Sequence, residues 1–313
     1  MHTGRHARQA GRRRADDIGL DGIGTDSIDD DVMSLNARSG DRSVLRLTAG
    51  RSVAEIHPAF GGRLGQLDLG DGPLLRAHAP DLGWTDWGCY PLAPWSNRLP
   101  GGRLRYRGID SVLPPNHADG SAIHGLVAAC RWDITASTRS RAELEVRAES
   151  TPYSVAVRQL FELDDEVLRI ALRCTNEGDR GVPMGLGIHP WFHSGPIRVP
   201  ADRVWPGEPL PTGPPQPPRP QQDLRQSRLP EPMDACFTAL TGSYADAPGC
   251  RLHWEGPVTH VVVYSGAPGW VCIEPVTMAN DGIRMAEEGQ RGHGVIEVQP
   301  GDSMEVRYRF ERR

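Results

Sequence analysis

Short runs of alternating apolar and polar residues recur along most of this chain. The clearest is Leu168–Cys174, in which every second residue is apolar and two of the three intervening residues are arginines. A period of two places one set of side chains on a buried face and the other toward solvent, which predicts a β-strand. Similar runs predict strands at Val53–His57, Leu144–Ala148, Val155–Leu163, Val261–Tyr264, Val271–Glu274 and Met304–Phe310.

Glycine and proline separate these runs. The chain holds 36 glycines and 28 prolines, more than a helical bundle tolerates, and no apolar stripe with a 3.6-residue period exceeds about two turns. Many short strands between Gly/Pro breaks are typical of a β-sandwich. The pattern therefore predicts an all-β fold of antiparallel sheets, with few, short and peripheral helices.

The first 42 residues differ from the rest of the chain. A basic cluster at Arg5–Arg14 precedes several aspartates between Asp16 and Asp31, with few large apolar residues. Such a segment cannot offset its ordering entropy by burial, so residues 1–42 are predicted to be a disordered extension. Residues 43–313 are long enough to form one large β domain.

Charge and cysteine usage exclude several classes of protein. The net charge is −5, and all 35 basic residues are arginines without a basic stripe through the domain, so no nucleic-acid partner is expected. No run of 18 apolar residues predicts a membrane span, and no signal peptide is visible, which favours the cytoplasm. The six cysteines lack a C-x-x-C pair and are expected to be free thiols.

Two segments read as unusual loops. Pro206–Pro220 is nearly all proline, glycine and polar residues, which predicts an extended, solvated excursion at the surface. The second, Trp84–Asn97, is predicted to be irregular and carries four large aromatic residues, namely Trp84, Trp87, Tyr90 and Trp95. These rings either plug one end of the sandwich or line a sugar site, because flat aromatic faces pack against pyranose rings. The sequence leaves both interpretations open.

Two short motifs offer polar groups to a ligand. Asn97 and Arg98 supply paired donors and acceptors that suit vicinal hydroxyls, although the pair also fits a hairpin connection. His124 precedes Gly125, which lets a backbone and a ligand approach closely. A purely structural histidine fits this second motif as well.

Two further motifs offer proton chemistry. Pro190 biases His189 toward an extended conformation, and an imidazole with an ordinary pKa of about 6.5 suits proton donation near neutrality. Glu274 ends an apolar strand, where partial burial would raise its pKa and make it a better base. A strand-end glutamate facing water is the alternative for Glu274.

In order and spacing, these motifs make the chain resemble the aldose 1-epimerase (galactose mutarotase) family over roughly residues 45–310. The match is carried by Asn97-Arg98, His124-Gly125, His189–Phe192, Asp234–Phe237 and Glu274-Pro275. The resemblance implies a galactose-mutarotase-like β-supersandwich and an isomerase that interconverts the anomers of a free aldohexose. It implies a small-molecule sugar as substrate and no cofactor or metal, and it leaves the oligomeric state open.

The same resemblance implies roles for six residues. Glu274 is implied as the catalytic base and His189 as the catalytic acid. His124 and Arg98 would hold the sugar and its ring oxygen, Asp234 would bind hydroxyls, and Asn97 would act beside Arg98. The chain departs from the family in reading His-Pro-Trp-Phe at the second histidine, which leaves the identity of the sugar open.

Other functions remain compatible with the sequence. The many arginines, including Arg98, Arg103 and Arg105, suit a hexose-6-phosphate 1-epimerase, since guanidinium binds phosphate in a bidentate manner. A non-catalytic carbohydrate-binding module on the same fold is a second alternative. A zinc site at His124, His189 and Glu274 lacks H-x-x-E-type spacing. Polysaccharide cleavage would require Asp234 and Glu274 to flank one bond.

Overall fold

The computed structural model describes residues 44–313, and most regular structure in this part of the chain is β-strand. The predicted alternation is clear in strand β12 (Val167–Asn176), where apolar side chains are buried while Arg169 and Arg173 are exposed. All seven strands predicted from the sequence fall within strands of the structure. The extension predicted at residues 1–42 lies outside the described residues.

Long antiparallel ladders build a seven-stranded sheet in the order β17-β18-β22-β12-β11-β10-β9. Its central strands alternate because one face is buried and the other is exposed. The remaining bounds are β17 (Tyr244–Ala247), β18 (Cys250–Glu255), β22 (Ser303–Arg312), β11 (Tyr153–Asp164), β10 (Arg141–Ser150) and β9 (Asp133–Ser137).

A nine-stranded sheet has the order β1-β2-β3-β4-β14-β20-β19-β16-β15. Its bounds are β1 (Leu45–Ala49), β2 (Ser52–His57), β3 (Arg63–Asp68), β4 (Cys89–Leu92), β14 (Gly187–His193), β20 (Trp270–Val276), β19 (His260–Tyr264), β16 (Asp234–Leu240) and β15 (Ala201–Val204). In the middle strands β4, β14, β20 and β19, nearly every residue is buried. Both faces of these strands are therefore covered, so their sequences do not alternate regularly between apolar and polar residues.

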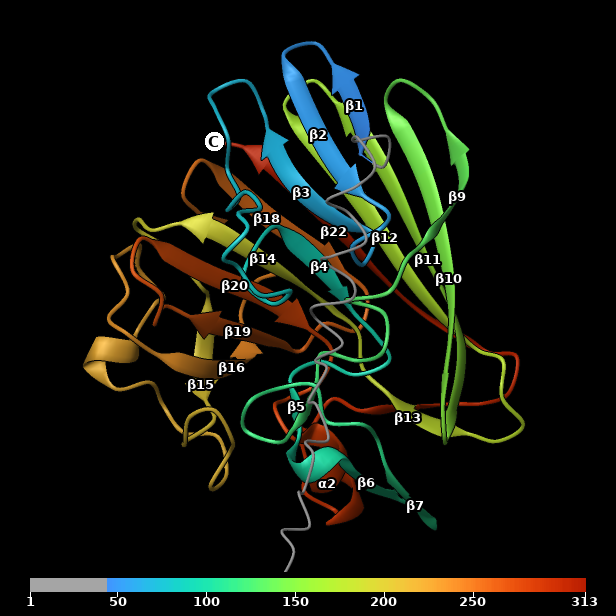
Figure 1. The fold of residues 1–313 in the computed structure, drawn as a ribbon. Coiled ribbons are helices and arrows are strands. Elements are labelled where there is room, and N and C mark those ends of the chain that lie inside the picture. Colours follow the sequence, from blue (N-terminus) through green and yellow to red (C-terminus); the bar gives the residue numbers. More distant parts are fainter. Residues whose placement is uncertain (1–43) are drawn as a thin grey trace, which may run out of the picture. The chain divides into compact units, whose positions relative to one another are not determined.

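The two sheets share one hydrophobic core. Buried residues from both sheets form a single cluster. Strand β1 contacts β10 and β11, and β2 contacts β11, as the crossing of these strands in Figure 1 shows. A second, smaller cluster lies on the nine-stranded sheet and includes Tyr90, Trp191, Val262 and Cys272. It covers the opposite face of that sheet, and that face carries the candidate site.

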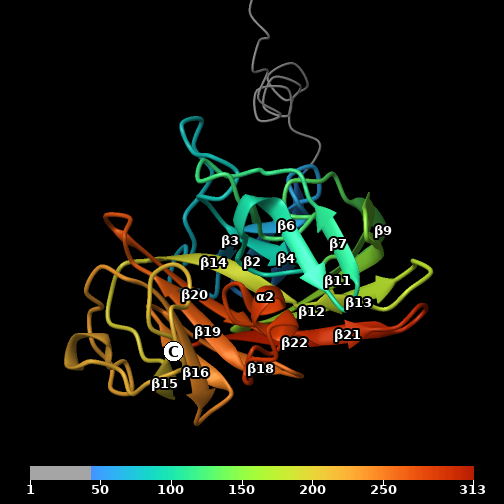
Figure 2. The ribbon, with the colours of Figure 1, turned by 90° about the horizontal axis from the view of Figure 1, so that it is seen from below.

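Helices are short, as the sequence predicted. Helix α2 (Gly282–Glu287) has six residues and contacts strand β6 (Arg103–Tyr106), which pairs with β7 (Ile109–Val112), as Figure 2 shows. Two more small ladders join β5 (Arg98–Leu99) to β8 (Ala122–Ile123) and β13 (Val182–Met184) to β21 (Ile296–Val298). No helix in residues 44–313 is long and apolar enough to cross a membrane.

One sequence prediction is wrong in part. The segment Trp84–Asn97 was expected to be irregular, yet it contains β4, a strand in the interior of the nine-stranded sheet. All four residues of β4 are buried, so the strand lacks the alternation that identifies a half-exposed strand. Pro91 within it also reads as a break, because proline cannot donate a ladder hydrogen bond.

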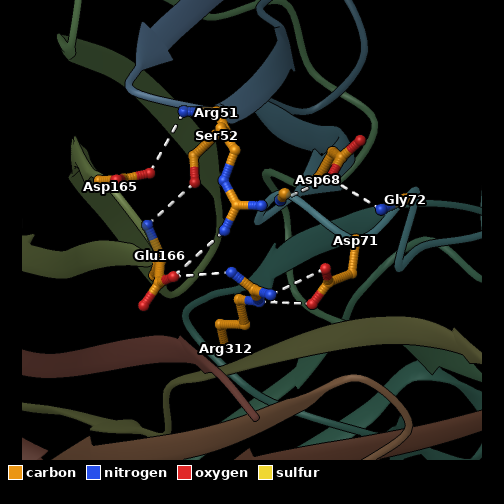
Figure 3. A network of polar contacts seen from close by, with 9 residues as sticks. Arg51, Ser52, Asp68, Asp71, Gly72, Asp165, Glu166 and Arg312 are labelled. Atoms are coloured by element: carbon orange, nitrogen blue, oxygen red, sulfur yellow. Dashed lines mark hydrogen bonds and ion pairs between the residues drawn. The ribbon is translucent and has the colours of Figure 1, made fainter.

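A polar network ties the end of the last strand to three turns (Figure 3). Arg312 forms ion pairs with Asp71 and Glu166. In the same network, Glu166 donates its backbone N–H to Ser52 Oγ over 3.0 Å, and Asp165 accepts the backbone N–H of Arg51 over 3.2 Å. The network links the β1–β2 and β11–β12 turns to the C-terminal strand, but exposed ion pairs each contribute little stability.

Candidate active site

Strands β14 and β20 place the two predicted proton-transfer residues together. Their register pairs Trp191 with Cys272, and two residues further along it places His189 opposite Glu274. Ile188, the neighbour of His189, packs into the core between the sheets. Because side chains alternate along a strand, His189 and Glu274 project from the other face.

His189 and Glu274 are in direct contact. The distance from His189 Nε2 to Glu274 Oε1 is 3.1 Å, and the two residues are 6% and 2% exposed. Their other polar atoms, His189 Nδ1 and Glu274 Oε2, are buried and have no hydrogen-bond partner among the described residues. The alternative considered from the sequence, a strand-end glutamate that faces water, is therefore wrong for Glu274.

Burial perturbs both groups strongly. Loss of hydration raises the pKa of Glu274 well above its ordinary value, and the nearby charge of Asp234 raises it further. Burial also lowers the pKa of His189 to about 3, with smaller contributions from Arg63 and Arg98. Both shifts disfavour charge, so burial favours a neutral carboxyl group beside a neutral imidazole.

His124 lies against the same pair from another direction. Its ring centroid is 5.0 Å from that of His189 with the planes nearly perpendicular, and burial lowers its pKa well below the ordinary value. A backbone contact fixes its place: a Cβ on Gly125 would lie only 1.9 Å from the carbonyl oxygen of Ala93. Gly125 at φ +82° is therefore required by the close approach of two chain segments.

Arg98 and Asp234 form the more exposed part of the site. Arg98 Nη1 lies 3.8 Å from Asp234 Oδ2, and Arg98 Nε donates to Asp119 Oδ2 over 2.9 Å. Burial raises the pKa of Asp234, although Arg98 opposes this shift. The guanidinium is thus shared by two carboxylates.

Asn97 shapes the turn that presents Arg98. It lies in the left-handed region at φ +55°, and its Oδ1 accepts the backbone N–H of Arg98 over 2.9 Å. Its carbonyl oxygen accepts the backbone N–H of His124 over 2.9 Å. Asn97 therefore contacts two of the predicted ligand-binding residues through their backbones, and direct binding of a sugar by Asn97 stays a prediction.

Aromatic rings surround the histidines. Tyr90 stacks on His189 with ring centroids 4.7 Å apart, and Trp191 stacks on it at 5.8 Å. Trp84 meets His124 edge-on at 6.4 Å. An apolar wall of this kind excludes water and suits the apolar face of a sugar ring.

The other two aromatic residues of Trp84–Asn97 lie elsewhere. Trp87 packs edge-on against His78 at 4.9 Å, and Trp95 stacks on Tyr153 at 5.6 Å inside the core. Trp84 and Tyr90 thus lie beside the candidate site and Trp95 lies in the core, and contact of these rings with a sugar stays a prediction.

Sequence reasoning missed three residues of this region. Trp191 and Cys272 lie two positions from His189 and Glu274 on the same strands, so the period of two could have found them. Glu208 could not be found in that way. Its Oε2 accepts the backbone N–H of Asp234 over 3.1 Å, which brings the proline-rich excursion against the site.

One group of side chains has the composition of a metal site. Single ligand atoms of His189, Cys272 and Glu274 all lie within 4.8 Å of one another. This set differs from the zinc set suggested by the sequence, because Cys272 stands in place of His124.

A large surface hollow lies away from the predicted site residues. A hollow of about 1070 Å³ lies on the outer face of the seven-stranded sheet, and none of the six predicted site residues lines it. Its walls are mainly charged side chains such as Arg158 and Glu145, which pair across strands at 2.6 Å. This surface lacks the buried acid–base pair found on the other sheet.

Comparison with known proteins agrees with this architecture. The aldose 1-epimerase family model matches residues 43–311, so the chain belongs to the aldose 1-epimerase family. Uncharacterized protein YphB of Escherichia coli K12 is 32% identical over 137 residues, which are 42% of this chain and 47% of that protein. The chain thus aligns with about half the length of this relative.

Solved structures share the fold. A crystal structure from Escherichia coli K12 is 24% identical with a TM-score of 0.75, covering 86% of this chain and 98% of that one. A galactose mutarotase-like protein from Clostridium acetobutylicum is 20% identical with a TM-score of 0.71, covering 86% and 95%. The predicted galactose-mutarotase-like all-β fold is confirmed.

Proposed function

We propose that this protein interconverts the α and β anomers of a free aldohexose by acid–base ring opening and reclosure. The observation that carries the proposal is the 3.1 Å contact between His189 Nε2 and Glu274 Oε1 in a buried setting. Anomer exchange requires one proton to leave O1 while another reaches the ring oxygen, and a carboxylate and an imidazole can perform both transfers.

The proton balance suits the pair. In the reactive form Glu274 is the carboxylate and His189 the imidazolium, which differs from the neutral pair only by the position of one proton. Glu274 takes the proton of O1, the bond from C1 to the ring oxygen breaks, and His189 protonates that oxygen. After rotation about C1–C2, the ring oxygen attacks the other face of the aldehyde, and both protons return to their origins.

Neighbouring groups would hold the sugar during these steps. Arg98 and Asp234 present a guanidinium and a carboxylate that suit hydroxyls, and His124 lies at the edge of the His189 ring. Asn97 would maintain the backbone that positions Arg98 and His124. Fixing the pyranose in this way brings both proton transfers into reach.

Local charge supports a neutral sugar over a hexose 6-phosphate. Arg98 already faces Asp119 and Asp234, and Glu208 adds a third carboxylate nearby. Arg103 and Arg105, which suggested phosphate binding, instead lie near Asp110 on the β6–β7 hairpin at 3.9 and 3.1 Å. A phosphate dianion beside Asp234 would be repelled.

The buried acid–base pair also distinguishes catalysis from simple binding. Removing a carboxylate from water raises the free energy of the folded protein. A module that only binds carbohydrate has no use for a carboxylate buried at this cost. Perturbed titratable groups of this kind gather at active sites. This argument supports an enzyme over a non-catalytic module.

Polarimetry tests the proposal. The protein should accelerate the change in optical rotation of freshly dissolved α-glucose or α-galactose more than that of the corresponding 6-phosphates. Glu274→Gln should lower the rate about 10²–10⁴-fold, whereas Glu255→Gln, at an exposed position on the other sheet, should not. Strong sugar binding without acceleration by the wild-type protein would favour the non-catalytic alternative.

A further inference from the structure

Cys272 occupies a position that the proposed reaction does not use. It lies two residues before Glu274 on β20 and projects from the same face of the sheet. Its side chain is fully buried, and its register partner on β14 is Trp191. A thiol is thus held beside the acid–base pair without a part in proton transfer.

Three different donor types meet at this point. Ligand atoms of His189, Cys272 and Glu274 lie within 4.8 Å of one another, and all three residues are at least nine-tenths buried. Glu274 Oε2 and His189 Nδ1 have no hydrogen-bond partner among the described residues. These buried oxygen and nitrogen atoms are therefore available to a ligand.

We propose that His189, Cys272 and Glu274 form a site for a borderline-soft divalent cation such as zinc or cadmium, and that the bound cation inhibits the enzyme. Imidazole nitrogen, thiolate sulfur and carboxylate oxygen are the three donor types that zinc takes in proteins. Three protein ligands leave a fourth position for water. Hard cations such as magnesium prefer sets of oxygen ligands and should not bind here.

Binding requires a defined release of protons. The thiol loses its proton to become the ligand, and the proton shared by His189 and Glu274 is also displaced. The thiolate and the carboxylate then neutralise the charge of the cation, so no net charge is buried. Zinc distances of about 2.0–2.3 Å require the three side chains to close around the ion.

Inhibition follows from the identity of the ligands. Two of them are the residues proposed to transfer protons to and from the sugar, so cation and reaction exclude each other. This half of the inference rests on the proposed function, whereas cation binding does not.

Cadmium is the probe, because cadmium bound to thiolate absorbs in the ultraviolet. The metal-free full chain should bind one equivalent with this absorption and should gain thermal stability. Cys272→Ser should lose the absorption and bind at least about ten-fold more weakly. Cys236→Ser is the matched control, because Cys236 is buried on the same sheet, two strands away, and lies outside the group.

The outcomes separate the two proposals. Cadmium absorption that persists in Cys272→Ser, or wild-type protein without absorption and without thermal stabilisation, would overturn the cation site. If the wild-type enzyme shows mutarotation, cadmium should abolish it, a chelator should restore it, and Cys272→Ser should remain active in cadmium. Equal inhibition of Cys272→Ser would overturn the inhibitory role. If mutarotation is absent altogether, the absorption and thermal measurements still decide whether the cation site exists.

Discussion

Tyr90 lies flat against His189, with ring centroids 4.7 Å apart and planes inclined by 16°. The guanidinium of Arg63 lies 4.9 Å from the centroid of the same tyrosine ring. Arg63 is 1% exposed, and its guanidinium donates to the carbonyl oxygens of Phe60, Trp87 and Ala128. A buried cation, an aromatic ring and the proposed catalytic imidazole are thus in successive contact.

This stack predicts a role for Tyr90 in positioning His189. Tyr90→Leu should lower kcat about five-fold, because an aromatic pair contributes about 1 kcal/mol beyond its buried area. Tyr90→Phe keeps the ring, loses only the hydroxyl that donates to Thr85 O, and should retain most activity. Steady-state polarimetry of both variants is the measurement. Equal losses in the two variants would contradict a role for the ring itself.

The pH dependence of the reaction should be flat near neutrality. Burial lowers the pKa of His189 to about 3 and raises that of Glu274 well above its ordinary range. The pair gains a second proton only well below about pH 6.5, and loses its single proton only as pH rises through the raised value of Glu274. Enzymatic kcat/KM, corrected for buffer catalysis, should therefore show no inflection near about pH 6.5. An inflection there would indicate an unperturbed histidine acid.

The sequence predicts strands β10, β11, β12 and β22 of the seven-stranded sheet, but only β2, β19 and β20 of the nine-stranded sheet. In strands with one exposed face, apolar and polar residues alternate, as they do in Leu168–Cys174. Strand β4 (Cys89–Leu92) is buried on both faces and contains Pro91, so neither alternation nor composition marks it as a strand. Strand β4 is buried by segments from distant parts of the chain, so its own sequence does not reveal this burial.

The candidate site shows the same division. Glu274 lies in a strand predicted from its sequence, whereas for His189 the sequence indicated only an extended conformation before Pro190, and β14 was not predicted. Their contact depends on the register between β14 and β20, which no local pattern encodes. The approach of Glu208 to Asp234 is a contact across 26 positions in an irregular segment, so only the folded structure shows it.

Acid should destabilise the protein through buried neutral histidines. Burial lowers the pKa of His260 to about 3, below the value of about 6.5 expected in the unfolded chain. The unfolded state binds a proton first, so stability is lost as pH falls below about 6.5. His260→Gln should weaken this pH dependence of the unfolding free energy by about 1.4 kcal/mol per pH unit.

Urea unfolding at several pH values between about 6 and about 4 measures this slope. His193→Gln, which makes the same substitution at an exposed position on β14, is the matched control. If the unfolding free energies of wild type and His260→Gln change equally with pH, the lowered pKa of His260 is contradicted.

Gly125 should be far less tolerant of substitution than Gly101. Both have positive φ, so alanine is strained at either position by about 1 kcal/mol. At Gly125 the added Cβ also meets the Ala93 carbonyl oxygen, whereas nothing lies within 4 Å at Gly101. Gly125→Ala should therefore destabilise by about 3 kcal/mol or more and displace His124. Chemical denaturation of both variants is the comparison, and equal losses would contradict the close approach.

The central claim is that His189 and Glu274 together move protons at the anomeric centre of a sugar. Magnetisation transfer by NMR between the α and β anomers at equilibrium measures that exchange directly. The wild-type protein should accelerate exchange of a free aldohexose, and both Glu274→Gln and His189→Asn should reduce the acceleration at least about 100-fold. Full acceleration by either folded variant, or none by the wild type across a panel of aldohexoses, would contradict the account.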